Sequence, residues 1–173
     1  MVPFWKSIAG SDLAQGDYLT RCLVPYVPKE FGSSTLPQEI SIRSADFVVI
    51  TQTCDLVNMK SGLVALCPIR TLAKYEETNP MFGRKGAWEE VRKGRRDGLH
   101  LLASPSTPEK SRDAMVVDFR EIYSLPIEYL SQHAASHASR WRLDSPFLEH
   151  FSQAFARFFM RVGLPSAIPP ILD

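Results

Sequence analysis

The sequence has few of the features that place a protein in a specialised class. Only three of its 173 residues are cysteine, no two of them form a CxxC pair, and their odd number does not suit a disulfide framework. No stretch approaches the roughly 20 apolar residues of a membrane helix, and the first residues lack the basic start and apolar core of a secretory signal. These absences predict a cytoplasmic protein with free thiols that does not enter membranes.

Recognisable catalytic and metal-binding motifs are also missing. The chain contains no phosphate-binding glycine loop, no GxSxG turn and no RNP-type aromatic segment. His133 and His137 have the i, i+4 spacing of two metal ligands on a helix, but the residues between them lack the glutamate of a zinc protease motif. We therefore expect neither a metal nor another cofactor.

Composition and patterning predict an α+β fold in a single domain. With 45% hydrophobic and 23% charged residues, the chain is long enough to bury a core. Short apolar runs between turn residues indicate a small, strongly bent antiparallel sheet or β-barrel over residues 16–119. A basic helical insertion is expected at 72–96, and a helical extension at 120–173.

Six segments have the character of strands. In the first, alternation places Tyr18, Cys22 and Val24 on one face. The β-branched and aromatic run that begins at Phe47 predicts a central strand covered on both faces, and Pro68 predicts a strand edge or exit. The predicted strands are 16–28, 47–51, 62–72, 98–104, 114–119 and 140–143.

Helices are predicted at 71–79 and 87–94, whereas 126–139 suits either a helix or an irregular arm. The clearest helix follows Ser145, a plausible N-cap, with Pro146 at the first helical position. Gly163 and Pro165 mark its end. Its apolar face is typical of core, with a partner-docking face as the alternative, in which Phe151, Phe155 and Phe158 would bind the partner. The face consists of Phe147, Leu148, Phe151, Phe155, Phe158, Phe159 and Val162.

A cluster of short polar side chains follows the strand that begins at Phe47. Gln52, Cys54 and Asp55 lie where the chain is expected to leave the sheet. A partly exposed Cys54 could act as a nucleophile, but no histidine is close in sequence, and Asp55 would disfavour the thiolate. The alternative is a cysteine packed under a turn capped by Asp55 and Asn58.

Positive charge is concentrated in one segment. Residues 84–96 contain six basic residues against two acidic ones, whereas the whole chain has a formal net charge of +1. Cations can neutralise phosphates, and an aromatic among them can stack on a base. The segment is either a nucleic-acid-binding patch or a solvated basic loop and helix with its tryptophan packed inward. The candidate residues are Arg84, Lys85, Trp88, Arg92, Lys93, Arg95 and Arg96.

The order of elements over residues 16–72 resembles that of PemK/MazF-type proteins. The shared features are a Gly-Asp strand (GDYLTRCLVPYV), a polar loop, an arginine, a buried strand with a polar turn (FVVITQTCDLVN) and a strand ending in Pro-Ile (GLVALCPIRTL). Those proteins are SH3-like β-barrels, mostly mRNA endonucleases paired with antitoxins. The resemblance implies a metal-independent endoribonuclease whose catalytic arginine corresponds to Arg43 and whose catalytic threonine falls near Thr71. Arg43, Arg70 and Thr71 are therefore the candidate catalytic residues, expected near the phosphate. The arginine would stabilise charge while the 2′-hydroxyl of the RNA attacks.

The segment TQTCDL also resembles uncharacterised bacterial and phage proteins that have Ser/Thr-Gln-x-Cys-Asp after a strand. Two hypotheses follow. In the first, the protein is a toxin-like barrel that binds or cleaves RNA and is held by an antitoxin. In the second, it is a non-catalytic interaction component of an anti-phage defence or mobile-element system, with another subunit of that system as its partner. A homodimer is compatible with either.

Overall fold

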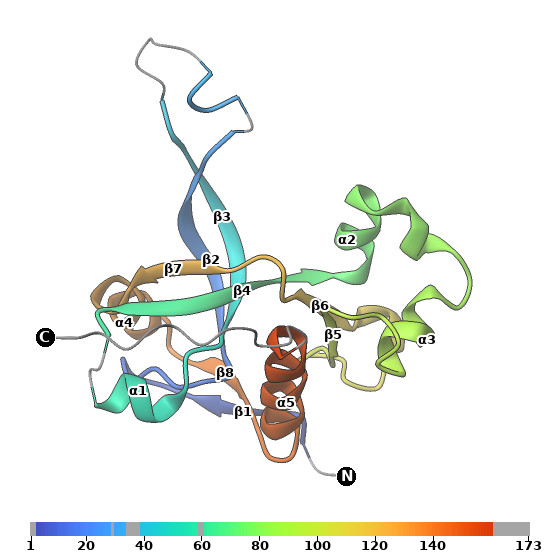
Figure 1. The fold of residues 1–173 in the computed structure, drawn as a ribbon. Coiled ribbons are helices and arrows are strands. Elements are labelled where there is room, and N and C mark those ends of the chain that lie inside the picture. Colours follow the sequence, from blue (N-terminus) through green and yellow to red (C-terminus); the bar gives the residue numbers. More distant parts are fainter. Residues whose placement is uncertain (1–2, 29, 34–38, 59–60, 161–173) are drawn as a thin grey trace, which may run out of the picture.

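The computed structural model describes residues 3–28, 30–33, 39–58 and 61–160 (Figure 1). Within these ranges the chain forms eight strands, five α-helices and two short 3-10 helices. The strands are β1 (Trp5–Ile8), β2 (Asp17–Tyr26), β3 (Ser41–Val49), β4 (Leu63–Thr71), β5 (Leu99–Leu102), β6 (Met115–Asp118), β7 (Tyr123–Pro126) and β8 (Arg140–Leu143). The helices are α1 (Thr53–Val57), α2 (Leu72–Thr78), η1 (Pro80–Gly83), α3 (Ala87–Arg92), η2 (Ser111–Asp113), α4 (Ile127–Ala135) and α5 (Phe147–Phe159).

All eight strands belong to one antiparallel sheet in the order β1-β8-β2-β3-β4-β6-β5, with β7 also paired to β4. The α+β class is therefore confirmed. The sheet is not closed, so the prediction of a barrel is not confirmed. A side chain rather than a backbone ladder connects its two ends, because the indole nitrogen of Trp5 in β1 donates to the carbonyl oxygen of Ala103, just after β5 (2.8 Å).

β3 is an inner strand of the sheet, as predicted, and residues 47–49 are buried on both faces, although the strand begins at Ser41, six residues before the predicted start. Phe47 and Val49 lie in a core cluster that α4 covers, while Val48 and Ile50 lie in a second cluster that α5 covers. Alternate side chains of a strand point to opposite faces of the sheet, so a strand covered on both sides has a continuous apolar run. This explains why the signal in the sequence was strong.

The prediction that Tyr18, Cys22 and Val24 share a face is wrong for Tyr18. Tyr18 packs in the α5 cluster, whereas Cys22 and Val24 belong to the α4 cluster. The pairing with β3 shifts between Leu19 and Cys22, where β2 has one residue more than its partner. An extra residue of this kind is a β-bulge, and it reverses the alternation beyond it.

Pro68 does not end its strand, contrary to the prediction. It lies inside β4 opposite Phe47, at the point where the outer neighbour of β4 changes from β7 to β6. A proline has no N–H to donate to a ladder, and a gap between two partners tolerates this. Two further strands of four residues, β1 and β7, were not predicted.

The predicted helices are present, and residues 127–135 form a helix rather than an irregular arm. α5 begins at Phe147, one residue later than predicted, with Pro146 in the N-cap position and no side-chain cap. The predicted end of this helix at Gly163, with Val162 before it, lies outside the described residues. No helix in the described part of the chain is both long enough and apolar enough to cross a membrane.

The segment after β4 forms a small layer of its own. α2, η1 and α3 pack together around a third buried cluster, which also contains side chains of β5 and β6. The layer therefore rests on the β5–β6 end of the sheet (Figure 1). Its buried residues are Leu72, Tyr75, Phe82, Val91, Leu99 and Val116.

Candidate nucleic-acid interface

A cleft of about 450 Å³ lies between α5 and the segment that joins α3 to β5. Three arginines line it, Arg92, Arg96 and Arg157, together with His100 and His150. Asp97 is the acidic residue of the lining, and the partly buried Phe158 provides aromatic surface, whereas Phe119 is fully buried. We call this site the α3–α5 cleft. It combines cations and aromatic rings, the two kinds of side chain with which proteins hold single-stranded nucleic acids.

The polar side of α5 forms one wall of the α3–α5 cleft. His150, Gln153 and Arg157 all line it and have the spacing i, i+3, i+7, which places them on one side of a helix. The apolar side of the same helix contributes Phe151 to the core. The burial of one face of α5 therefore determines where its cationic face points.

A second hollow, of about 420 Å³, lies on the other side of α3. Arg84 and Lys85 line it, together with Glu90 and Arg96. Arg96 lines both hollows and so connects them. Basic side chains from Arg84 to Arg157 thus line two hollows that meet at Arg96, with Glu90 and Asp97 as the acidic residues among them.

Acidic neighbours reduce the charge of the basic segment. Arg92 pairs with Glu89 (2.6 Å), Lys93 is 3.4 Å from the same carboxylate, and Arg95 pairs with Glu90 (3.2 Å). The hydrogen bonds from Arg92, followed by its charge and by Lys93, lower the pKa of Glu89 to about 2. These pairs are exposed, and such pairs contribute little to stability. Their main effect is to direct Arg92, Lys93 and Arg95 along α3.

The cleft floor requires a glycine. Gly98 has a positive φ of +81°, and a Cβ atom at this position would be 3.0 Å from Cε2 of Phe158. A left-handed backbone together with a close neighbour leaves room only for hydrogen. Gly98 therefore allows Phe158 of α5 to lie close to the start of β5.

The ring of His100 packs against the rings of Phe119 and Phe151, with ring centroids 6.1 and 5.6 Å away. Burial, and to a smaller extent the charge of His150, lowers the pKa of His100 from 6.5 to about 4. The ring is therefore neutral at pH 7, although it lines a cationic cleft. It is suited to accept or donate a hydrogen bond, or to stack, but not to supply charge.

This lowered pKa makes the stability of the protein pH-dependent. The unfolded chain binds a proton at His100 near pH 6.5, whereas the folded chain binds it near pH 4, so stability is lost as the pH falls through this window. We expect the melting temperature of the wild type to fall more between pH 6.5 and 4 than that of His100→Leu. Melting curves at several pH values test this. The comparison variant His150→Gln removes only the smaller cause of the shift, so its curve should stay close to that of the wild type. Parallel curves for the wild type and His100→Leu would contradict it.

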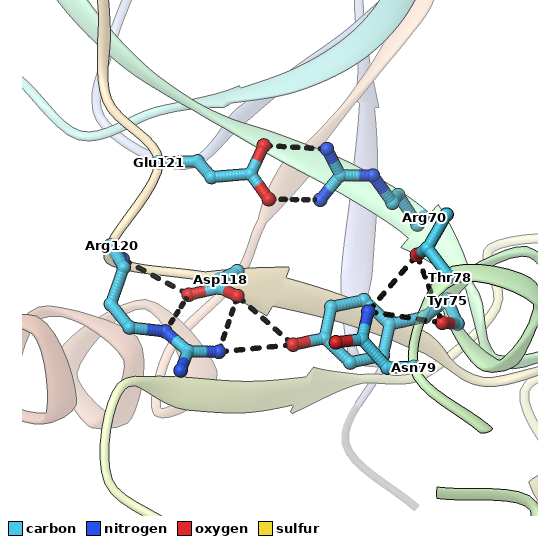
Figure 2. A network of polar contacts seen from close by, with 7 residues as sticks. All are labelled: Arg70, Tyr75, Thr78, Asn79, Asp118, Arg120 and Glu121. Atoms are coloured by element: carbon cyan, nitrogen blue, oxygen red, sulfur yellow. Dashed lines mark hydrogen bonds and ion pairs between the residues drawn. The ribbon is translucent and has the colours of Figure 1, made fainter. Parts of the chain in front are cut away.

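Figure 2 shows the polar network where α2 meets the end of β6. The hydroxyl of Tyr75 donates to Asp118 (2.9 Å), and the guanidinium of Arg120 donates to both oxygens of Asp118 (2.8 and 2.6 Å). Burial by itself raises the pKa of Asp118, but the hydrogen bonds from Arg120 and Tyr75 outweigh it and lower that pKa below its usual value. The network fixes α2, and with it the helical layer, to the sheet.

The residues that the family resemblance marks as catalytic are engaged in separate contacts. Arg43, in β3, stacks over the ring of Tyr26 at 3.1 Å from its centroid. Arg70, in β4, forms a two-pronged ion pair with Glu121 (2.8 and 2.6 Å; Figure 2). Thr71 caps α2 by accepting a hydrogen bond from the Lys74 amide (3.2 Å). β4 pairs with β3 only as far as Asp46, so Arg43 lies beyond their shared ladder.

The polar cluster after β3 begins a short helix. Gln52 is the N-cap of α1, and Cys54 and Asp55 lie in its first turn. Cys54 is exposed, with its sulfur 3.6 Å from the Gln52 side-chain oxygen and 3.8 Å from an oxygen of Asp55. The interpretation in which Cys54 is packed beneath a turn is therefore wrong.

Two of the aromatic candidates, Trp88 and Phe151, pack against other side chains of the fold. The indole of Trp88 donates to Glu76 (2.7 Å) and packs against Phe82, which agrees with the inward-packed interpretation. Phe151 is fully buried and cannot contact a partner in this fold, whereas Phe155 and Phe158 are partly buried against the same core. This finding corrects the assignment of Phe151 to a partner-binding face.

Several residues of the site did not stand out in the sequence. His100 lies within a short strand, and Arg157 lies 61 positions after Arg96, so no local motif connects them. The i, i+3, i+7 spacing of His150, Gln153 and Arg157 was the available signal, because it marks the polar face of a helix.

Comparisons with known proteins do not place the chain in a family. No protein-family model matches it, and no curated protein gives a significant match. In the described part of the chain, no group of three or more His, Cys, Asp or Glu side chains could hold a metal ion. The fold and the cleft therefore define the protein as an α+β protein with a cationic cleft beside its sheet.

Proposed function

We propose that the protein binds single-stranded RNA along the cationic surface that runs from Arg84 to Arg157. One observation carries this proposal: Arg96 joins two hollows that receive basic side chains from segments far apart in the sequence. A single small anion would need only one such hollow. A nucleic acid has a phosphate at each nucleotide, so it can contact basic side chains in both hollows.

The aromatic content of the α3–α5 cleft favours a single strand. Phe158 and His150 present rings at the same site as Arg96 and Arg157, so phosphate and base can be contacted together. In a double helix the bases are stacked on each other and their faces are not accessible. The resemblance of residues 16–72 to a family of RNA endonucleases favours RNA over DNA. Cleavage is not part of the proposal, because Arg43 and Arg70 are held by Tyr26 and Glu121.

We expect Arg96→Ala and Arg157→Ala each to weaken RNA binding by about tenfold at low salt, because each removes a charge-assisted hydrogen bond to phosphate worth about 1.4 kcal/mol. The affinity of the double variant should also depend less on salt, by about 0.7 in the slope of log K against log[salt] for each arginine–phosphate interaction that is removed. Fluorescence anisotropy with a labelled, mixed-sequence RNA in EDTA measures both effects.

Arg43→Ala is the matched control, since Arg43 is an exposed arginine of β3 that lines neither hollow. It should leave the affinity unchanged. If Arg43→Ala weakens binding as much as Arg96→Ala does, the RNA lies on the surface implied by the family resemblance instead. Failure of the wild type to bind RNA at low salt would overturn the proposal. A DNA strand of the same sequence shows whether the 2′-hydroxyl matters, and a denaturing gel of the incubated RNA detects any cleavage.

A further inference from the structure

The β2–β3 ribbon projects beyond the rest of the sheet, away from α5 (Figure 1). The two strands remain paired from Cys22 and Ala45 to Tyr26 and Ser41. β4 pairs with β3 only from Asp46 to Val49, so the outer part of β3 does not have this neighbour. A two-stranded ribbon alone is only marginally stable in water.

One face of the projecting ribbon is apolar and uncovered. Leu23 is 57% exposed and Ile42 61% exposed, and Ile42 lies directly opposite Pro25. Beyond the paired residues, Val27 and Ile40 are also exposed, at 53% and 46%. The opposite face differs: Cys22 and Val24 are buried in the core, and Arg43 lies over Tyr26. Within the described outer segment of β3, residues 41–45, the only cation is therefore on the face that does not carry the apolar residues.

The two edges of the ribbon are also unequal. At the β2 edge, the hydroxyl of Tyr129 accepts a hydrogen bond from the Leu23 amide (2.8 Å) and donates to the Leu23 carbonyl (3.0 Å). Because the Leu23 backbone groups point outward, its partner Ser44 also points its N–H and C=O away from β2. Ile42 lies two residues before Ser44 in β3, so its N–H and C=O also point away from β2. In the described residues no strand pairs with Ser41–Ala45 on that side, so β3 presents an open edge.

We propose that a second copy of this chain pairs with the open edge of β3, antiparallel and about a two-fold axis at Ile42. An antiparallel edge is complementary to itself, and a two-fold axis closes the assembly at a dimer. An apolar face without charge also suits an identical face, because charge of one sign would repel its copy. This inference does not depend on RNA binding.

The side chains determine the register. With Ile42 opposite its copy, Ile40 faces Ser44 of the second copy, and Ser41 faces Arg43. An axis at Arg43 would instead place two guanidinium groups directly opposite each other, which is destabilising. In the Ile42 register the outward N–H and C=O groups of Ile42 and Ser44 are all paired, and the apolar faces of the two ribbons become continuous.

The oligomeric state tests the inference. We expect light scattering after size exclusion to show a dimer for the wild type and a monomer for Ile42→Lys, which places like charges at the axis. Because Ile42 is exposed in the single chain, the variant should fold normally, and its circular dichroism spectrum should match that of the wild type. Val57→Lys is the control, because Val57 is 72% exposed but lies in α1. It should remain a dimer.

Cross-linking tests the register. In a Cys54→Ser background the two remaining cysteines, Cys22 and Cys67, are buried. Adding Ile42→Cys should then give a covalent dimer with a short bismaleimide, whereas adding Leu63→Cys, at another exposed position, should not. A wild type that is monomeric at every accessible concentration would overturn the inference. So would an Ile42→Lys variant that stays dimeric, or equal cross-linking at positions 42 and 63.

Discussion

Replacing Asp17 by alanine is expected to lower the free energy of unfolding by about 3 to 5 kcal/mol, a large part of the total stability of a domain of this size. The Asp17 carboxylate is fully buried and bonded to Arg140, itself buried, and to Arg142. It also accepts a hydrogen bond from the Ala14 amide (3.1 Å). Without it, the guanidinium of Arg140 would be buried beside no anion. Denaturant unfolding followed by circular dichroism measures the loss.

Asp12→Ala is the matched control for this prediction. Arg140 and Arg142 both donate to the main-chain oxygen of Asp12, and Asp12 itself is exposed. Alanine keeps that oxygen, so the variant should lose less than about 1 kcal/mol, as exposed substitutions usually do. Equal losses for Asp12→Ala and Asp17→Ala would show that the buried ion pair is not what holds the N-terminal segment on β8.

Replacing Phe151 by alanine is expected to cost about 3 to 5 kcal/mol, because it removes a fully buried ring and leaves a cavity. Phe151 contacts His100 and Phe119 edge-on, with both centroids at 5.6 Å. The loss should appear as a lower denaturant midpoint with an unchanged slope, since the surface exposed on unfolding is nearly the same.

Phe159→Ala tests whether all phenylalanines of α5 contribute equally to stability. Phe159 is 51% exposed at the end of the same helix, so this variant should lose well under half as much stability as Phe151→Ala. A loss as large as that of Phe151→Ala would show that the end of α5 is buried in solution, by a partner or by another part of the chain.

The elements that could be predicted are those with a strong local signal. The apolar run at Phe47 marked a strand buried on both faces, and the apolar spacing of residues 147–159 marked α5. Both patterns arise from the geometry of a single element. The bulge after Leu19 has no such local pattern. Because of it, Tyr18 lies on the opposite face of the sheet from Cys22 and Val24. Pro68 was misread because a proline inside a strand is tolerated only where the neighbours leave a gap, and neighbours are not visible in a local pattern.

The candidate site was partly visible for the same reason. The basic segment 84–96 was evident from composition, but Trp88 is engaged with Glu76, and Arg157 and His150 are brought to it from another element. The family resemblance singled out Arg43, Arg70 and Thr71, whose contacts are with Tyr26, Glu121 and Lys74. The Arg96, Arg157 and Arg43 variants test whether the proposed RNA site lies at the α3–α5 cleft or at the residues that the resemblance singles out.

The sequence by itself determined the α+β class, most of the strands and helices, and the place where positive charge accumulates, because these depend on side-chain periodicity and composition over a few residues. Only the tertiary structure decided that the sheet stays open, that Asp17 meets Arg140 and Arg142 more than 120 positions away, and that α5 and the α3–β5 segment enclose one cleft. Such contacts depend on how all the elements pack at once. The residues that make these contacts are far apart in the sequence. No pattern over a few neighbouring residues can therefore reveal them.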